Sequence, residues 1–154
     1  MSNTVMTFLI IVLFIGVLIL NYWVRVRRQL KSPLGMATLI LANINYNERR
    51  VENFGFHRGA GRMKTGAWKK NKNKVDFLPQ ELQMSLSQLF DMVEEVNDRI
   101  DAARSFKSDS YLSGIDVSKL KAPLAENKER LYGWIQENMD NPAYQPKRRR
   151  TLLG

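Results

Sequence analysis

The hydrophobic pattern of the chain begins with one long apolar run. Residues 5–20 are all apolar except Thr7 and Gly16, and the next four residues, Asn-Tyr-Trp-Val, extend the run. About 20 residues in a helix cross the ~30 Å hydrocarbon core of a bilayer, and a helix satisfies its own backbone polar groups there. The pattern predicts a transmembrane helix over residues 5–24, after a short external N-terminus, residues 1–4.

Two other interpretations of this run are less favoured. A cleaved secretory signal normally has a basic first region, a shorter apolar core and a small-residue cleavage site. Residues 1–4 contain no Lys or Arg, and residues 20–31 offer no such cleavage site. A helix buried in a soluble core is the least favoured interpretation. The sequence therefore favours an uncleaved, single-pass anchor.

The charges beside the run predict its orientation. No basic side chain precedes it, whereas Arg25, Arg27, Arg28 and Lys31 follow it directly. Because Lys and Arg are enriched on the cytoplasmic side of transmembrane helices, we expect the N-terminus outside and the rest of the chain in the cytoplasm. The predicted location is a plasma or inner membrane, or an organellar equivalent.

The next segment, residues 25–54, predicts a basic juxtamembrane helix from about Pro33 to Asn53, with its apolar residues in the first half. Ser32 is placed to cap it, and Gly55 is placed to end it in a left-handed conformation. The apolar part is too short to span a bilayer. It could lie as an amphipathic helix against the headgroups or pack on the protein's own core, and both interpretations stay open.

Residues 55–75 predict a basic loop that contains glycines. They include seven Lys or Arg and no acid. Gly61 and Gly66 have the spacing of a P-loop, but Ala67 and Trp68 stand where that motif needs Lys and then Ser or Thr. Three interpretations stay open for the loop: contact with an anionic membrane surface, contact with an acidic face of this chain or of a partner, and binding of a nucleic acid.

The strongest helical pattern lies within residues 76–140. Apolar residues from Leu82 to Ala103 recur at alternating spacings of four and three, which keeps them on one helix face for about three heptads. Phe90 and Met92 widen that face beyond a narrow coiled-coil seam. We favour packing in a helical hairpin, and a coiled-coil dimer is the alternative.

A second helix is expected from about Pro123 to Met139, with Asp116 capping a short turn before it. Trp134 would be a core anchor or a contact for a partner. The predicted fold class is all-α: a single N-terminal transmembrane helix followed by a small cytoplasmic helical hairpin or coiled-coil-like module. The residues expected to form the packing or partner seam are Leu82, Leu86, Leu89, Val93, Val96, Ile100, Leu124, Leu131, Trp134 and Ile135.

Charge divides the chain into three parts. Residues 1–74 hold 13 basic and 2 acidic residues, residues 75–140 hold 7 and 13, and residues 141–154, a tail expected to be disordered, hold 4 and none. Each Lys or Arg near an anionic leaflet is attracted to it by about 1 kcal/mol. The candidate contacts with anionic lipids are Arg25, Arg27, Arg28, Lys31, Arg58, Arg62, Lys64, Lys69, Lys70, Lys72, Lys74, Lys147, Arg148, Arg149 and Arg150.

The sequence predicts no catalytic, cofactor or metal site. It has no Cys and one His, so it offers neither a thiolate nucleophile nor a Cys and His metal set. The acidic residues on the outer face of the 82–103 helix lack the Glu-x-x-His pattern of a di-iron bundle. They predict a solvated face or a docking face for basic residues, with surface pairs between Glu95 and Arg99 and between Asp101 and Arg104.

We therefore expect a scaffold or accessory subunit rather than an enzyme. The anchor would hold it in the membrane, the basic segments would contact anionic headgroups, and residues 78–139 would receive a protein partner or a second copy of the chain. The alternative is a membrane-tethered nucleic-acid-binding protein that uses residues 58–74 and 147–150, with Trp68 and Phe56 stacking on bases.

Overall fold

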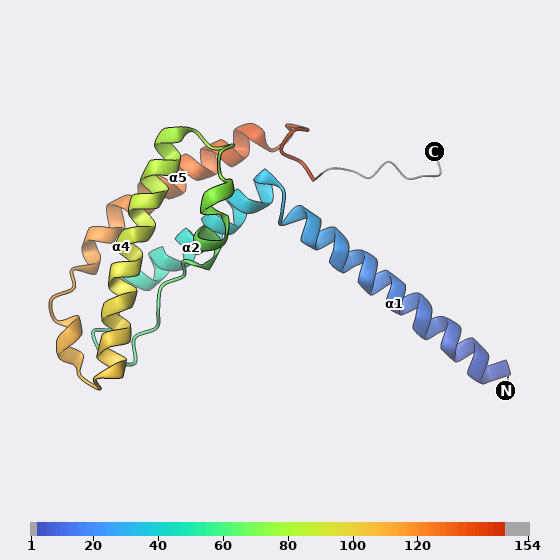
Figure 1. The fold of residues 1–154 in the computed structure, drawn as a ribbon, viewed down its shortest axis with the longest axis horizontal. Coiled ribbons are helices and arrows are strands. Elements are labelled where there is room, and N and C mark those ends of the chain that lie inside the picture. Colours follow the sequence, from blue (N-terminus) through green and yellow to red (C-terminus); the bar gives the residue numbers. More distant parts are fainter. Residues whose placement is uncertain (1–2, 147–154) are drawn as a thin grey trace.

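The computed structural model describes residues 3–146, and these residues contain helices and no strand (Figure 1). The elements in chain order are α1 (Asn3–Gln29), α2 (Pro33–Glu52), α3 (Gly66–Asn71), the 3-10 turn η1 (Lys72–Lys74), α4 (Gln80–Ser105), the 3-10 turns η2 (Asp109–Leu112) and η3 (Val117–Leu120), and α5 (Lys121–Asn138). The predicted all-α class is confirmed. The helix α1 stands apart, and α2 to α5 form one module.

The helix α1 leaves the module as a single exposed rod. Its window Ile10–Arg27 has a mean hydropathy of 1.9, and none of it is buried. By length and composition this helix can cross a membrane. It continues to Gln29, past the predicted span 5–24, because nothing in the sequence interrupts the helix before the elbow described next. Residues 25–29 therefore belong to α1 and not to the following helix.

The helices α1 and α2 meet at a tight elbow of three residues. The Ser32 hydroxyl donates to the Gln29 carbonyl at 2.7 Å and accepts from the Gly35 N–H at 3.1 Å, so one side chain joins the end of α1 to the start of α2. Gly35 approaches α1 so closely that a Cβ there would overlap the Gln29 carbonyl oxygen. As predicted, Ser32 caps α2 and Pro33 opens it.

The helix α2 packs on the module's own core rather than lying apart at a surface. Its buried apolar residues are Met36, Ala37, Ile40, Ile44 and Val51. It ends at Glu52, with Asn53 as the cap, and the predicted left-handed Gly55 is wrong because Gly55 has no positive φ. Instead the Asn53 backbone N–H and side-chain amide both donate to the Arg49 carbonyl, at 3.3 and 3.0 Å, which satisfies the end of the helix locally.

The helices α4 and α5 fold back on each other, and α2 packs against α5 to complete the core. Arg130 of α5 pairs with Glu81 in the first turn of α4 at 3.6 Å, and Lys128 of α5 pairs with Glu48 of α2 at 2.6 Å. The module is therefore a hairpin with a third helix against it. As predicted, Asp116 caps η3 by accepting from a backbone N–H.

Three aromatic rings join the chain after α5 to the segment before α4. Phe77, before α4, lies 5.2 Å from Trp134 of α5, and Tyr144, near the end of the described chain, lies 5.3 Å from Trp134, all between ring centroids. Trp134 is buried in this cluster. The chain after α5 is thereby held against the segment that precedes α4.

Candidate functional site on the basic segment

Residues 58–69 comprise an irregular stretch followed by the first turn of α3, and they run antiparallel to α2. The Lys64 N–H donates to the Asn47 side-chain oxygen at 2.7 Å, and the Asn47 amide donates back to the Lys64 carbonyl at 2.8 Å. Further along, the Ala67 N–H donates to the Asn43 side-chain oxygen at 3.0 Å. The later residue of the segment, Ala67, thus contacts the earlier residue of α2, Asn43, so the segment and α2 run in opposite directions.

The helix α4 holds the other side of the same segment. The Met63 N–H donates to the Asn97 side-chain oxygen at 2.7 Å, and the Asn97 amide donates to the Met63 carbonyl at 3.1 Å. Arg104 donates to the Ala60 carbonyl at 2.6 Å. Asn97 is fully buried, so these bonds satisfy groups that have no access to water. We call residues 58–69 the clamped segment, since amide side chains from two helices grip its backbone.

Packing reinforces the clamp at Trp68. The indole is buried and stacks on Phe90 of α4, with ring centroids 5.4 Å apart and planes 8° from parallel. Trp68 lies on α3, a short helix within the region predicted to be a loop. Its face is therefore covered, and it cannot stack on a nucleobase without leaving the core. Phe56, by contrast, is exposed.

Two basic side chains of the clamped segment dock on the acidic face of α4. Arg62 lies 2.9 Å from Asp101, and Lys69 lies 2.8 Å from Glu94. The predicted surface pair between Asp101 and Arg104 is not formed, because Arg104 turns to the backbone of the segment and Asp101 receives Arg62. The acidic face of α4 is thus a docking face for this chain's own cations.

The Glu94 carboxyl titrates below its ordinary value of 4.5. Its partial burial would raise the pKa, because removing water disfavours the charged form. The hydrogen bonds from Lys69 and Thr65 and the positive charges of Lys69 and Arg62 outweigh that effect and lower the pKa. Glu94 therefore stays ionised when the segment is in place.

The other two basic residues of the clamped segment also contact their own chain. The Lys64 ammonium lies 4.2 Å from the centroid of the Tyr46 ring, a distance at which a cation is attracted to the ring face. The Arg58 backbone N–H donates to the Asp109 carboxylate, and its guanidinium donates to the Lys107 carbonyl at 3.3 Å. All four basic residues of the segment are engaged.

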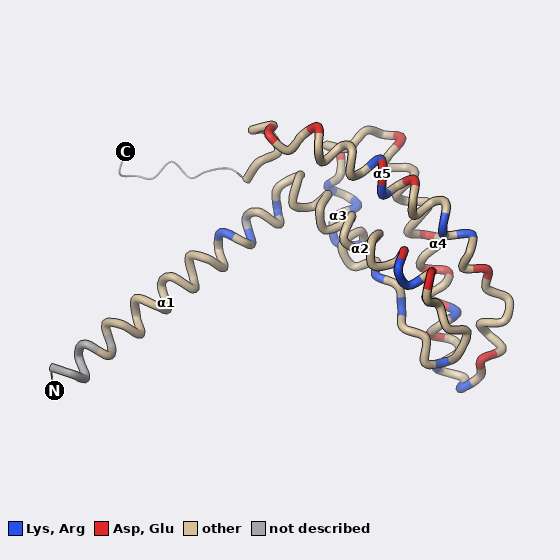
Figure 2. Tube along the Cα trace, turned by 180° about the vertical axis from the view of Figure 1, so that it is seen from behind, with Lys and Arg blue, Asp and Glu red and all other residues tan. Residues whose placement is uncertain are grey.

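The next three basic residues are placed differently. Lys70, Lys72 and Lys74, which we call the lysine cluster, are exposed at the end of α3 and along η1, and they form no ion pair with the residues that the structure describes. Because the clamped segment runs antiparallel to α2, its continuation leads toward the start of α2, where the elbow joins α1. Figure 2 shows Lys and Arg positions gathered at the end of α1 and around α2 and α3, and most Asp and Glu positions along α4 and α5.

The remaining predicted cations divide between the end of α1 with its elbow and the tail. Arg25, Arg27 and Arg28 lie in the last two turns of α1, and Lys31 lies in the elbow. The Arg27 guanidinium lies 3.6 Å from the centroid of the Trp23 ring. The four basic residues of the tail lie outside residues 3–146, the part that the structure describes.

The predicted packing or partner seam lies inside the module. Its buried members are Leu82, Leu86, Leu89, Val93, Val96, Ile100, Leu124, Leu131 and Trp134, and Ile135 is half-buried. All of them belong to one core that α2 also enters. A protein that bound the folded module would therefore meet its outer surfaces and not this seam.

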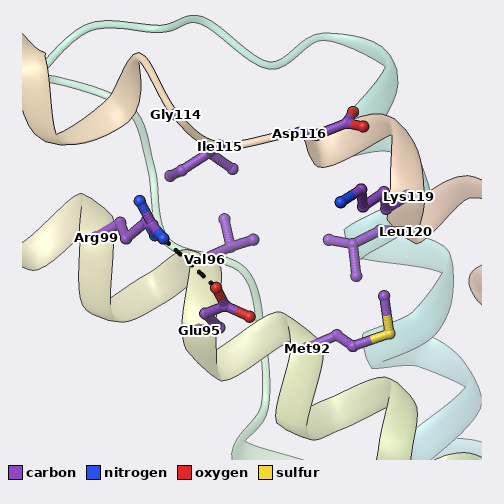
Figure 3. A pocket seen from close by; sticks show the side chains of 9 residues that line it. All are labelled: Met92, Glu95, Val96, Arg99, Gly114, Ile115, Asp116, Lys119 and Leu120. Atoms are coloured by element: carbon purple, nitrogen blue, oxygen red, sulfur yellow. Dashed lines mark ion pairs between the residues drawn. The ribbon is translucent and has the colours of Figure 1, made fainter.

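One pocket of about 230 Å³ opens between α4, the loop that follows η2, and η3 (Figure 3). Charges of both signs line its rim. Arg99 pairs with Glu95 at 3.6 Å, as predicted, and the pKa of Asp116 is lowered by its hydrogen bonds with Ser118. The residues that line the pocket are Met92, Glu95, Val96, Arg99, Gly114, Ile115, Asp116, Lys119 and Leu120. Within the described residues, no group of three or more His, Cys, Asp or Glu is placed to hold a metal ion.

The sequence interpretation missed the clamping amides, although the pattern carried a signal. Ile40, Ile44, Asn47 and Val51 recur at spacings of four, three and four, so a polar residue stands within the apolar face of α2. An amide inside such a face must find a buried hydrogen-bond partner. Asn97, between Val93 and Ile100 on α4, carries the same signal.

Comparisons with known proteins give no relative for this chain. No protein-family model, no curated protein and no solved structure matches it. Its function is therefore inferred from its own geometry.

Proposed function

We propose that this chain is a single-pass, membrane-anchored scaffold or accessory subunit, not an enzyme, and that its helical module receives a protein partner. The observation that carries this proposal is the exposed apolar helix α1, joined through an elbow of three residues to a module with a closed core. An apolar rod of this length needs a lipid environment. The module is thereby tethered at a bilayer surface.

The charges next to the anchor support a cytoplasmic module. Arg25 and Arg27 are exposed on the last two turns of α1, and Lys31 follows in the elbow. Because such residues are enriched on the cytoplasmic side, these charges support an N-terminus outside. The membrane would be a plasma or inner membrane, or an organellar equivalent.

The closed core restricts where a partner can bind. Leu89 and Val93 are 1% and 0% exposed, so an Asp at either position would bury an unpaired charge and unfold the module. Loss of a partner from such a variant would report unfolding and not docking. The larger exposed apolar side chains of the module include Met84, Tyr132 and Met139, and an interface would draw on outer positions of this kind.

The proposal is tested by purifying the full-length chain from its native membrane in a mild detergent. We expect mass spectrometry to find another protein in stoichiometric amount. A chain in which residues 5–24 are replaced by an unrelated apolar span, with the elbow unchanged, is the matched comparison. The companion should persist in it, because the module and not the span carries the contact. If the native chain is recovered alone, the accessory-subunit role is wrong. If the companion is lost only from the replaced chain, the partner binds the apolar span and not the module.

A further inference from the structure

We propose that the lysine cluster, Lys70, Lys72 and Lys74, is the module's contact with anionic phospholipid headgroups in the leaflet from which α1 emerges. The clamped segment takes no part in that contact. This inference rests on the membrane anchoring of the proposed function, but not on the protein partner. It divides a basic region that is continuous in sequence into a structural half and a lipid-binding half.

The clamped segment is excluded because its cations are already engaged. Arg62 and Lys69 hold carboxylates of α4 at 2.9 and 2.8 Å, Lys64 covers an aromatic ring, and Arg58 is bonded to the turn after α4. A headgroup phosphate would have to displace these contacts. The lysine cluster has no such competitor among the described residues.

The lysine cluster is held on an ordered turn. Asn71 is buried between the first two lysines, where its amide donates to the Ala67 carbonyl at 2.9 Å. Val75 is buried directly after the third lysine. The backbone under the cluster is thus fixed at both ends, so lysine contact with a surface requires less ordering of the backbone than it would in a loose loop.

The position of the cluster relative to α1 favours a lipid surface over a soluble ligand. The antiparallel course of the segment brings η1 toward the start of α2, and the elbow separates α2 from the anchor by three residues. The module extends to one side of α1 and does not continue its axis (Figure 1). A module that leaves its anchor sideways lies over the leaflet around the anchor, and its basic side borders α1 (Figure 2).

Local charge also favours an anionic surface. Between residues 53 and 80 the chain has one acid, Asp76, beside the three exposed lysines. Each lysine held at an anionic surface multiplies the population of the bound state about fivefold, so the three together contribute roughly a hundredfold. That factor should fall as salt shortens the Debye length from about 8 Å.

The experiment uses the full-length chain, which has no Cys and so accepts a single label. Asn73→Cys places a fluorophore between the lysines, at an exposed position, and Ala125→Cys places it on the exposed face of α5. Each protein is reconstituted into vesicles of phosphatidylcholine alone, or of phosphatidylcholine and phosphatidylserine in equal parts, with an acceptor dye on the headgroups. We expect stronger energy transfer from position 73 in the phosphatidylserine vesicles, lost at high salt, with little change at position 125.

Two variants with equal changes of charge sharpen the test. The triple variant Lys70→Gln, Lys72→Gln and Lys74→Gln should reduce transfer from position 73 to the level seen in phosphatidylcholine alone. The control triple Lys107→Gln, Lys119→Gln and Lys121→Gln removes three exposed lysines between the end of α4 and the start of α5 and should keep the native signal. Circular dichroism of both variants checks that they remain folded. Equal transfer in the two kinds of vesicle, or no effect of the first triple variant, would overturn the proposal.

A nucleic acid is the competing ligand, and the same assay distinguishes it. An RNA oligonucleotide added to the phosphatidylserine vesicles should leave the energy transfer unchanged. If RNA abolished the transfer at an equimolar concentration, the cluster would be a nucleic-acid contact and the lipid proposal would fall. Co-purification of a protein companion with the first triple variant separates the lipid contact from the accessory-subunit role. The companion should persist while energy transfer is lost, so each proposal can fail without the other.

Discussion

The clamped segment and the lysine cluster are neighbours in sequence with similar composition, yet the fold treats them differently. The four cations of residues 58–69 contact carboxylates, a carbonyl or an aromatic ring of their own chain, whereas those of residues 70–74 form no ion pair with the described residues. The difference lies in what faces each half. The clamped segment lies along α4, so Arg62 and Lys69 reach the carboxylates of Asp101 and Glu94. The lysine cluster at the end of α3 and on η1 pairs with no carboxylate of the described residues. A basic run is therefore not one site, because its neighbours in space decide which charges remain available.

We expect the amide hydrogen bonds to hold the clamped segment in place more strongly than its ion pairs do. Asn47 and Asn97 each make two hydrogen bonds to the backbone of adjacent residues, Lys64 and Met63. Each amide therefore acts as a neighbouring strand would, on a segment that has no strand partner among the described residues. Exposed ion pairs contribute well under 1 kcal/mol each, whereas a buried backbone group left without its partner costs about 1 to 3 kcal/mol.

The largest expected effect follows from removing one clamp. Asn97→Leu keeps the volume of the side chain but leaves the Met63 N–H and carbonyl without partners, so we expect a loss of about 3 kcal/mol in the free energy of unfolding. Thermal unfolding of the full chain in detergent, followed by near-ultraviolet circular dichroism of buried Trp68, measures it. Asn73→Leu, at an exposed position of η1, is the control and should cost less than about 0.5 kcal/mol. Equal losses in the two variants would mean that the amides do not hold the segment.

An intermediate effect is expected from acid. The pKa of Glu94 is lowered in the folded chain, so its carboxylate stabilises the fold above the ordinary value of 4.5, and this contribution is lost as pH falls through the lower, folded value. Stability should therefore decrease as the pH is lowered below about 4.5, and Glu94→Gln should make that decrease shallower. Denaturant melts at several pH values measure this. Asp91→Asn, at an exposed position of the same helix, should change the curve less, and an unchanged slope in Glu94→Gln would contradict the proposed role of the Lys69 pair.

The smallest expected effect on stability comes from replacing single basic residues, one in the clamped segment and one in the lysine cluster. Arg62→Gln breaks the pair with Asp101, in which both side chains are nearly half exposed, so we expect a loss below about 1 kcal/mol. Lys72→Gln breaks no ion pair among the described residues and should leave stability unchanged. Urea unfolding of both variants in the same detergent measures the difference. If Lys72→Gln lost more stability than Arg62→Gln, the lysine cluster and not the clamped segment would carry the structural contacts.

The helices were predictable because their signals are local. The alternating spacings on α4, the Ser32 and Pro33 pair at the start of α2 and the Asp116 cap each depend on residues within a few positions. The apolar run predicted α1 for the same reason, although it underestimated its length. Local signals also misled: glycine at position 55 resembles a helix end, but Asn53 had already satisfied the helix, and the three-residue spacing of Asp101 and Arg104 predicted a pair that is not formed.

The clamp and the division of the basic region were not predictable in the same way. The amide contacts join residues 17 to 34 positions apart, and no periodicity reports such a distance. Lysines at 69 and 70 look alike in the sequence, and only the position of Glu94 in space distinguishes them. The buried Asn residues were visible as interruptions of apolar faces, but the sequence did not say which backbone they would bind.

The elbow couples the orientation of α1 to the orientation of the module. Ser32 bonds to both helices, and Gly35 leaves no space beside Gln29, so we expect rotation of α1 to be passed on to the module. A helix longer than the local hydrocarbon thickness accommodates by tilting. In a thinner bilayer, a tilt of α1 would swing the far end of the module along an arc, with the lysine cluster near the pivot. Bilayer thickness would thereby set the height at which the distal turns stand above the surface.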